Sequence, residues 1–205
     1  MKPIEKPAAL PGILIVEDEG IVARDLKRRL ERMGYTVLGT VDSGKAAIEL
    51  VPTLRPQLVL MDIVIQGPLD GIQTAEQIGV HHDVPIIFLT AHSDTATIQR
   101  AKRTTPYGYL IKPFEDHDLA TAIEMALYRH AAEHRQRLFQ RALDTTAVGI
   151  VVTAAEADGF PMAEMNPAFQ RMTGYAPGEM LQRHEWIQTI LQPSDVAFLR
   201  NVLTE

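Results

Sequence analysis

The chain has 205 residues, with 20 Lys and Arg against 26 Asp and Glu, which gives a formal net charge of −6. Hydrophobic residues make up 46 % and charged residues 22 %, as in ordinary folded globular chains. Cysteine is absent, which excludes disulfides, thiolate metal sites and cysteine nucleophiles. No apolar run reaches the roughly 18–20 residues that span a bilayer, and the N-terminus lacks the pattern of a signal peptide. We therefore expect a cytoplasmic protein without a membrane partner, whose acidic balance disfavours nucleic acid.

Residues 1–11 contain three prolines and are expected to form a loose N-terminal arm. From residue 12 onward, short runs rich in Val, Ile and Leu alternate with segments of helical periodicity. The five runs are Ile13–Val16, Thr36–Val41, Leu58–Met61, Pro85–Leu89 and Tyr107–Ile111. Strands that are buried on both faces have this composition. Residues 12–128 are therefore predicted to form an α/β domain, with a five-stranded parallel sheet doubly wound by helices.

The segments between these strands carry apolar residues at helical spacing. Helices are predicted around residues 22–33, 46–51, 72–78 and, with a weaker pattern, 94–105. Gly34 is a stop signal for the first of these helices, Pro56 follows the second, and the third is expected to end near Gly79.

A much longer helical pattern begins at Glu115 and meets no Gly or Pro before Gly149. Residues 129–144 are predicted to continue the last helix of the first domain as a linker that joins two modules, with a short dimeric coiled coil as its packing. The alternative is two shorter helices with a break near His130. His130 and His134 share a helix face and are expected at solvated or coiled-coil positions, because a metal site would need a third ligand.

Polar side chains follow four of the predicted strands. Glu17 and Asp18 come after the first, Asp62 after the third, Thr90 after the fourth and Lys112 after the fifth. The carboxyl ends of parallel strands form one edge of a sheet, where the functional sites of open α/β sheets lie. Three carboxylates about 5 Å apart repel by about 3 kcal/mol per pair at an effective dielectric constant of 20. A hard cation such as Mg²⁺ can offset this repulsion, with Lys112 beside it.

Each of these residues also has a plain structural interpretation. Asp18 and Glu19 could cap a helix that starts near Gly20, and Asp62 could cap a loop. Lys112 could be an ordinary surface lysine. No structural rule requires the whole combination, so we favour a site where a carboxylate accepts a phosphoryl group.

At this point the chain resembles the receiver domain of two-component response regulators, over about residues 12–128. The segments that carry the resemblance are Ile13–Glu19, Leu60–Ile63, the loop Gln66–Gly71, Leu89–Ala91 and Tyr109–Phe114. The resemblance implies a flavodoxin-like fold. It also implies phosphorylation by a histidine kinase or a phosphotransfer protein, and Mg²⁺-dependent self-phosphorylation from small phosphoryl donors. No ATP site is expected in this chain, so we expect a phosphoacceptor protein and not an enzyme.

The resemblance also implies the role of each residue in the acidic group. Asp62 would be the phosphoacceptor. Glu17 and Asp18 would hold Mg²⁺ together with Asp62 and the backbone carbonyl of Val64.

The remaining roles concern the phosphoryl oxygens and the conformational switch. Thr90, the backbone amide of Ala91 and Lys112 would contact the phosphoryl oxygens. Tyr109 would be the switch aromatic, whose alternative role is a plain core residue. The Lys112–Pro113 peptide bond is expected to be cis, a geometry that costs only about 0.5–1 kcal/mol before proline.

A phosphatase of the haloacid dehalogenase type would also place an aspartate after an apolar strand. Such enzymes need a second aspartate two residues later as a general acid, and Val64 occupies that position. We therefore do not expect this activity.

Residues 145–205 resemble the start of a PAS sensor domain. Val148–Thr153 and Phe160–Met165 are predicted strands, and Asn166 followed by Pro167 is typical of a helix start. The motif from Asn166 to Tyr175 carries the resemblance. Fewer residues remain than this fold needs, so we expect an incomplete PAS domain, and no ligand or cofactor residue can be assigned in it. Its three basic residues against seven acidic ones disfavour DNA binding.

The long helix favours a homodimer, formed through the linker or through the face made by the fourth helix, fifth strand and fifth helix. A relay of phosphorylation through the linker to the PAS region is the favoured function. Two alternatives stay open: a ligand-binding or dimerisation scaffold, and the regulatory N-terminal part of a hybrid histidine kinase.

Overall fold

The computed structural model describes residues 11–91, 100, 104, 106–153, 162–176 and 179. The chain divides into two compact units, residues 1–133 and 134–205, and one helix crosses from the first into the second. Most of the predicted fourth helix and the predicted turn around 157–159 lie outside the described residues.

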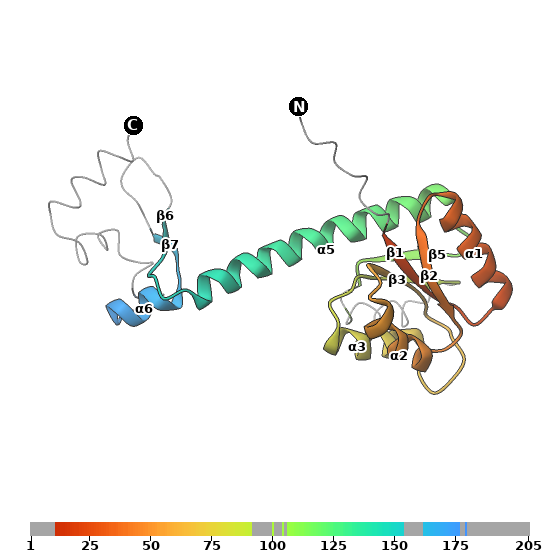
Figure 1. Ribbon diagram of the computed structural model, residues 1–205, viewed down its shortest axis with the longest axis horizontal. Helices are drawn as coiled ribbons and strands as arrows, with labels where there is room; N and C mark the ends of the chain where they lie inside the picture. The colour runs from red at the N-terminus through yellow and green to blue at the C-terminus, as the bar shows by residue number, and fades with distance from the viewer. Residues whose placement is uncertain are drawn as a thin grey trace, which may run out of the picture. The chain divides into compact units, whose positions relative to one another are not determined.

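The first unit is built on a five-stranded parallel sheet in the order β2-β1-β3-β4-β5 (Figure 1). Its strands are β1 (Gly12–Val16), β2 (Thr36–Val41), β3 (Leu58–Asp62), β4 (Ile86–Thr90) and β5 (Gly108–Ile111). Every residue of β1, β3 and β4 is buried, whereas β2 at the edge alternates between exposed and half-buried residues. The predicted strands, doubly wound sheet and parallel order are therefore confirmed, with strand ends shifted by at most one residue.

Helices cover both faces of this sheet (Figure 1). They are α1 (Gly20–Arg32), α2 (Gly44–Leu54), α3 (Gly71–His81) and α5 (Asp116–Thr145). Side chains of α2 and α3 complete the core on one face, and those of α1 and α5 complete it on the other. This arrangement leaves the carboxyl edge of the sheet to loops, which is where the polar residues of the sequence gather.

Helix α3 begins with a capping box and runs past Gly79. The Asp70 side chain accepts a hydrogen bond from the backbone N–H of Gln73, and the Gln73 side chain accepts one from the backbone N–H of Asp70. The helix was predicted to end near Gly79, and it ends two residues later, at His81. An interior glycine costs a helix only about 1 kcal/mol, which the buried side chains of Ile72 and Ile78 outweigh.

Helix α5 is one continuous element of 30 residues, so the alternative with a break near His130 is wrong. Its first half packs on the sheet through Leu119, Ile123 and Ala126. Beyond this core, the Tyr107 hydroxyl donates to Glu133 Oε2 at 2.7 Å. His130 is half-buried: its ring lies edge-on to Tyr107, with centroids 5.5 Å apart, and its Nε2 lies 3.1 Å from Asp83 Oδ1.

The second unit contains the hairpin β6 (Val151–Thr153) and β7 (Met162–Met165), followed by α6 (Pro167–Thr173). Asn166 caps α6 and Pro167 is its first residue, as the sequence predicts. Strand β6 is shorter than the predicted segment that began at Val148.

Candidate functional site

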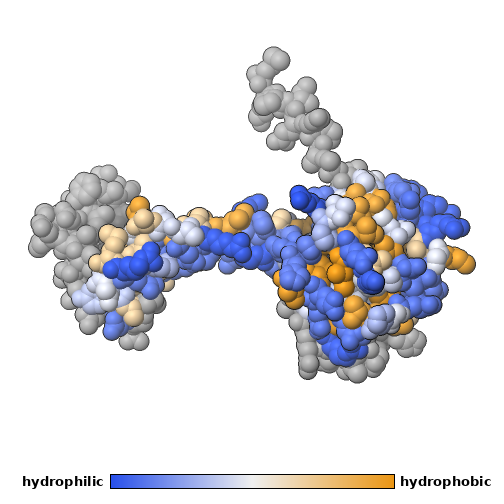
Figure 2. All heavy atoms as spheres, turned by 60° about the horizontal axis from the view of Figure 1, so that its bottom comes forward, coloured by the Kyte–Doolittle hydropathy of each residue, from blue (hydrophilic) through white to orange (hydrophobic). Residues whose placement is uncertain are grey.

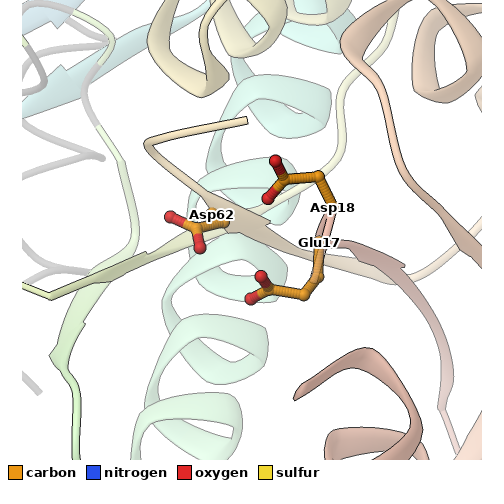
Figure 3. A group of neighbouring side chains, drawn as sticks. All are labelled: Glu17, Asp18 and Asp62. Carbon is orange, nitrogen blue, oxygen red and sulfur yellow. The ribbon is translucent and has the colours of Figure 1, made fainter. Parts of the chain in front are cut away.

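Three carboxylates meet at the carboxyl edge of the sheet (Figure 3). Glu17 and Asp18 directly follow β1, and Asp62 is the last residue of the neighbouring strand β3. Each offers an oxygen such that all three oxygens lie within 4.8 Å of one another. Glu17 and Asp62 are buried, with 2 % and 7 % exposure, and Asp18 is half-buried. The parallel sheet alone brings together residues that lie 44 or more positions apart in the sequence.

Lys112 supplies a cation to this cluster from the end of β5. Its Nζ lies 2.6 Å from Glu17 Oε2 and 2.6 Å from Asp62 Oδ2. Asp62 Oδ1 also accepts a hydrogen bond from the backbone N–H of Val64, at 2.9 Å. The Lys112–Pro113 peptide bond is cis. Four of the predicted site residues, Glu17, Asp18, Asp62 and Lys112, are thus brought together.

The carboxylates at the start of α1 do not act as helix caps. Glu19 occupies the N-cap position, but its side chain accepts no capping hydrogen bond. Asp18 instead accepts a hydrogen bond at 3.2 Å from the backbone N–H of Gln66, in the loop that follows Asp62. The capping interpretation of these two residues is therefore wrong, and Asp18 joins two loops of the site.

The loop after Asp62 is held close to its own strand by Gly71, the first residue of α3. The Gly71 N–H donates to the carbonyl of Ile63 at 2.9 Å. A Cβ on Gly71 would lie 1.9 Å from the carbonyl oxygen of Asp62. Only glycine permits the start of α3 to approach the end of β3 so closely. This contact holds the backbone of Asp62 in place.

The site's electrostatics follow from burial and from the single ammonium group. Burial raises the pKa of Glu17, the negative charge of Asp62 adds to this, and the hydrogen bond from Lys112 opposes it. Burial lowers the pKa of Lys112, but its hydrogen bonds to Asp62 and Glu17 outweigh that effect and raise the pKa above its usual value. Lys112 therefore stays charged at neutral pH. Three ionised carboxylates and one ammonium carry a formal charge of −2, which a divalent cation bound by oxygen ligands would neutralise.

Thr90 and Tyr109 lie beside the cluster on β4 and β5. Thr90 is buried, and its carbonyl accepts a 2.7 Å hydrogen bond from the backbone N–H of Lys112. Tyr109 pairs with Phe88 across the strands, with ring centroids 5.9 Å apart. Its hydroxyl is buried and has no hydrogen-bond partner in the described part of the chain, and burial raises its pKa. Ala91 follows Thr90 and is exposed.

A cleft opens beside the carboxylates, between α1 and the loop that follows β2. Besides Glu17 and Asp18 it is lined by Arg24 and Lys27 of α1 and by Asp42. Asp42 directly follows β2, a position similar to that of Asp62 at the end of β3. It is exposed and lies outside the three-carboxylate cluster.

Two polar connections of the molecule were not predicted from the sequence. Arg100 donates to Asp70 Oδ2 at 2.6 Å, which ties residue 100 to the cap of α3. Asn166 caps α6, but its side chain makes three further hydrogen bonds. Its Oδ1 accepts from Ile150 N–H at 2.8 Å, and its Nδ2 donates to the carbonyls of Leu143 and Val148, both at 2.9 Å. Asn166 followed by Pro167 predicted the cap of α6 from the sequence. The other contacts of Asn166 are to residues 16–23 positions away, and no local sequence pattern indicates them.

Comparison with known families agrees with this geometry. The family of response regulator receiver domains matches residues 13–124, and the PAS domain family matches residues 137–204. The chain therefore belongs to the response regulator receiver family and carries a PAS region after its receiver. Its function is two-component phosphorelay signalling, in which receivers act with histidine kinases or phosphotransfer proteins.

Individual relatives support the same assignment. The transcriptional regulatory protein PdtaR of Mycobacterium tuberculosis is 32 % identical over 201 residues, which cover 92 % of this chain and 95 % of that protein. The positive alginate biosynthesis regulatory protein of Pseudomonas aeruginosa is 38 % identical over 118 residues, 56 % of this chain and 46 % of that protein. These similarities to regulatory proteins support a regulator rather than an enzyme.

Solved structures place the first unit among receiver domains. The receiver domain of a modulated diguanylate cyclase from Desulfovibrio desulfuricans is 46 % identical, with a TM-score of 0.58, and the match covers 60 % of this chain and 98 % of that one. The N-terminal domain of a response regulator/sensory box/GGDEF protein from Carboxydothermus hydrogenoformans is 39 % identical, with a TM-score of 0.56, and the match covers 60 % of this chain and 98 % of that one. Among the described residues, no helix has the length and apolarity needed to cross a membrane.

Proposed function

We propose that Asp62 accepts a phosphoryl group from a phosphohistidine of a histidine kinase or phosphotransfer protein. The observation that carries this proposal is the convergence of Glu17, Asp18 and Asp62 with Lys112, whose ammonium contacts the proposed acceptor. In the reaction an Asp62 carboxylate oxygen attacks phosphorus, the phosphorus–nitrogen bond breaks, and the imidazole leaves with the bonding electron pair. A small acyl phosphate can donate in the same way.

The proposed metal is Mg²⁺, held by Glu17, Asp18, Asp62 and the carbonyl of Val64. The three convergent carboxylates, with a formal charge of −2 after Lys112 is counted, fit a hard divalent cation. When bound, Mg²⁺ supplies charge neutralisation for the incoming phosphoryl oxygens.

Protein groups on the other side of Asp62 complete the proposed reaction site. Lys112 pairs with one phosphoryl oxygen, and its raised pKa keeps the ammonium group charged for that role. The Thr90 hydroxyl and the Ala91 amide donate to others. Phosphoryl transfer depends mainly on such positioning and charge compensation.

In this proposal, Thr90 and Tyr109 change position when Asp62 is phosphorylated. The Tyr109 hydroxyl is buried without a hydrogen bond in the described residues, a costly state for a polar group that favours movement to a new position. Thr90 turns toward the phosphoryl group and Tyr109 follows it. A shift of the conformational balance from 1:99 to 99:1 requires about 5.5 kcal/mol of differential stabilisation.

Intact mass of the full chain after incubation with Mg²⁺ and acetyl phosphate tests this function. The wild type and the matched control Asp42→Asn should each gain one phosphoryl group, and Asp62→Asn should gain none. Chelation of the metal should abolish the gain. Stoichiometric phosphorylation of Asp62→Asn would show that another residue is the acceptor.

Further parts of the proposal concern organisation and partners. We place the receiver at residues 12–128, the linker at 129–144 and the PAS region at 145–205, preceded by the arm 1–11. The change is relayed through the linker to the PAS region. The chain acts in the cytoplasm, with protein partners rather than nucleic acid or lipid, which its net charge of −6 favours.

We also propose a homodimer, formed through the linker or through the face that includes β5 and α5. A groove on that face supports the second possibility, since it presents apolar side chains beside polar ones. Its lining includes Ile111, Pro113, Phe114, His117 and Met125.

A further inference from the structure

Beyond the first unit, α5 continues as a solvent-exposed helix as far as Ala142. Every residue from 134 to 142 is exposed, including Leu138 at 52 % and Phe139 at 64 %. Figure 2 shows hydrophobic residues interleaved with hydrophilic ones along this helix. A helix in water draws its stability mainly from packing of an apolar face, and isolated single helices are marginal. Exposure on all sides therefore indicates that this stretch packs against a partner.

The exposed residues of α5 contain one regular stripe, which we name the linker seam. Its members follow one another at steps of 3, 4, 3, 4 and 3 residues. They are Met125, Tyr128, Ala132, Arg135, Phe139 and Ala142. At about 100° per residue this stripe lies on the side of α5 opposite to Leu119, Ile123 and Ala126, which face the sheet. Alternating steps of 3 and 4 are the heptad pattern of a coiled coil, with five of six core positions apolar.

We infer that the linker seam binds a second copy of this chain as a parallel, in-register coiled coil, and that Arg135 keeps this dimer weak. The inference deepens the proposed homodimer and rests on the proposed relay function, because it names the seam and the residue that tunes it.

Charge complementarity favours a parallel arrangement. If Met125 occupies an a position of the heptad, Glu124 occupies the preceding g position and Arg129 the following e position. In a parallel coiled coil, the g residue of one helix pairs with this e residue of the other helix. Both side chains are exposed. The next such pair is Ala131 and Gln136, which carries no charge, and the one after it places Leu138 opposite Leu143, which widens the apolar strip. An antiparallel pair would place g opposite g and leave Glu124 without a basic partner.

Arg135 is the charged member of the seam. It takes part in no ion pair within the described residues, and a parallel dimer brings it opposite Arg135 of the other copy. Residues 129–141 carry four arginines and one glutamate, so both helices also repel as a whole. Arg135 can extend its guanidinium out of the seam, but the two like charges still oppose dimer formation. The wild-type dimer should therefore strengthen as salt screens this repulsion.

Sedimentation of the full chain tests the role of Arg135. Arg135→Leu should lower the dissociation constant of the dimer by about tenfold or more, because it replaces two opposed charges by apolar contact. Arg141→Leu, a matched exposed arginine on the opposite side of α5, should leave it unchanged. Raising salt from about 0.1 M to about 1 M shortens the Debye length from about 10 Å to about 3 Å and should tighten the wild-type dimer.

Cysteine cross-linking tests the seam and its direction, and the absence of native cysteine makes it clean. Ala132→Cys should form a disulfide between copies under mild oxidation, and Arg141→Cys should not. Monomers at all concentrations, equal cross-linking at both positions, or no effect of Arg135→Leu would overturn the inference. Ala132→Cys combined with Asp62→Asn should still cross-link, so a failed seam and a failed phosphoacceptor give separate results.

Discussion

Two glycines of helix α3 predict opposite effects of the same substitution. A Cβ on Gly71 would lie 1.9 Å from the Asp62 carbonyl oxygen and 2.9 Å from its carbonyl carbon, both backbone atoms that cannot rotate away. Gly79 has no atom within 4 Å of its Cβ position. Gly71→Ala should therefore destabilise the receiver by about 1–3 kcal/mol through overpacking. Gly79→Ala should stabilise it by about 1 kcal/mol, the difference in helix propensity.

Urea unfolding of the full chain, followed by circular dichroism, measures both effects. The receiver transition can be recognised because added Mg²⁺ should shift it. Gly71→Ala should also slow the gain of a phosphoryl group under conditions where the variant is still folded, since the displaced backbone belongs to Asp62. If Gly71→Ala were as stable as the wild type and were phosphorylated as fast, close packing of α3 would not be what positions the acceptor.

Three further predictions concern the charge of Glu17 and two hydrogen-bonded contacts of α5. Because the folded-state pKa of Glu17 is raised, its ionised form costs stability once pH rises above the usual value near 4.5. Metal-free Glu17→Gln should therefore be more stable than the wild type at neutral pH in thermal melts, and this gain should vanish below about pH 4.5. Asn166→Asp places a carboxylate oxygen against the carbonyls of Leu143 and Val148 and should cost about 2–3 kcal/mol, seen as faster hydrogen exchange around residue 150. Tyr107→Phe removes the 2.7 Å hydrogen bond to Glu133 and should cost about 1 kcal/mol of local stability. Hydrogen exchange in α5 near residue 133 should therefore be faster. An unchanged exchange rate there would show that this hydrogen bond does not stabilise the helix.

The sequence was enough to predict the acidic cluster because parallel strands impose a strong rule. Polar residues that end buried parallel strands must meet at one edge, so Glu17, Asp62 and Lys112 could be grouped without coordinates. The rule gives the neighbourhood but not the pairing. That Lys112 contacts Glu17 as well as Asp62, and that Asp18 bonds to Gln66, depends on loop conformations that no local pattern encodes.

Other features lacked a readable signal for a different reason. Gly71 could be read as a turn residue, but its approach to Asp62 depends on how α3 returns to β3. His130 fitted a solvated helix position by periodicity, and only the tertiary fold brings Tyr107 and Asp83 beside it.

The two faces of α5 differ in how far their apolar side chains continue along the helix. The face toward the sheet begins with buried apolar residues, Leu119, Ile123 and Ala126, and continues at the same heptad spacing with polar His130 and Glu133. This change from apolar to polar marks where the helix leaves the receiver core. On the opposite face the linker seam contains one charged residue, Arg135, and is apolar again at Phe139 and Ala142. An apolar stripe that continues beyond the receiver domain indicates contact with another helix. Its heptad spacing indicates that the other helix packs along the length of α5.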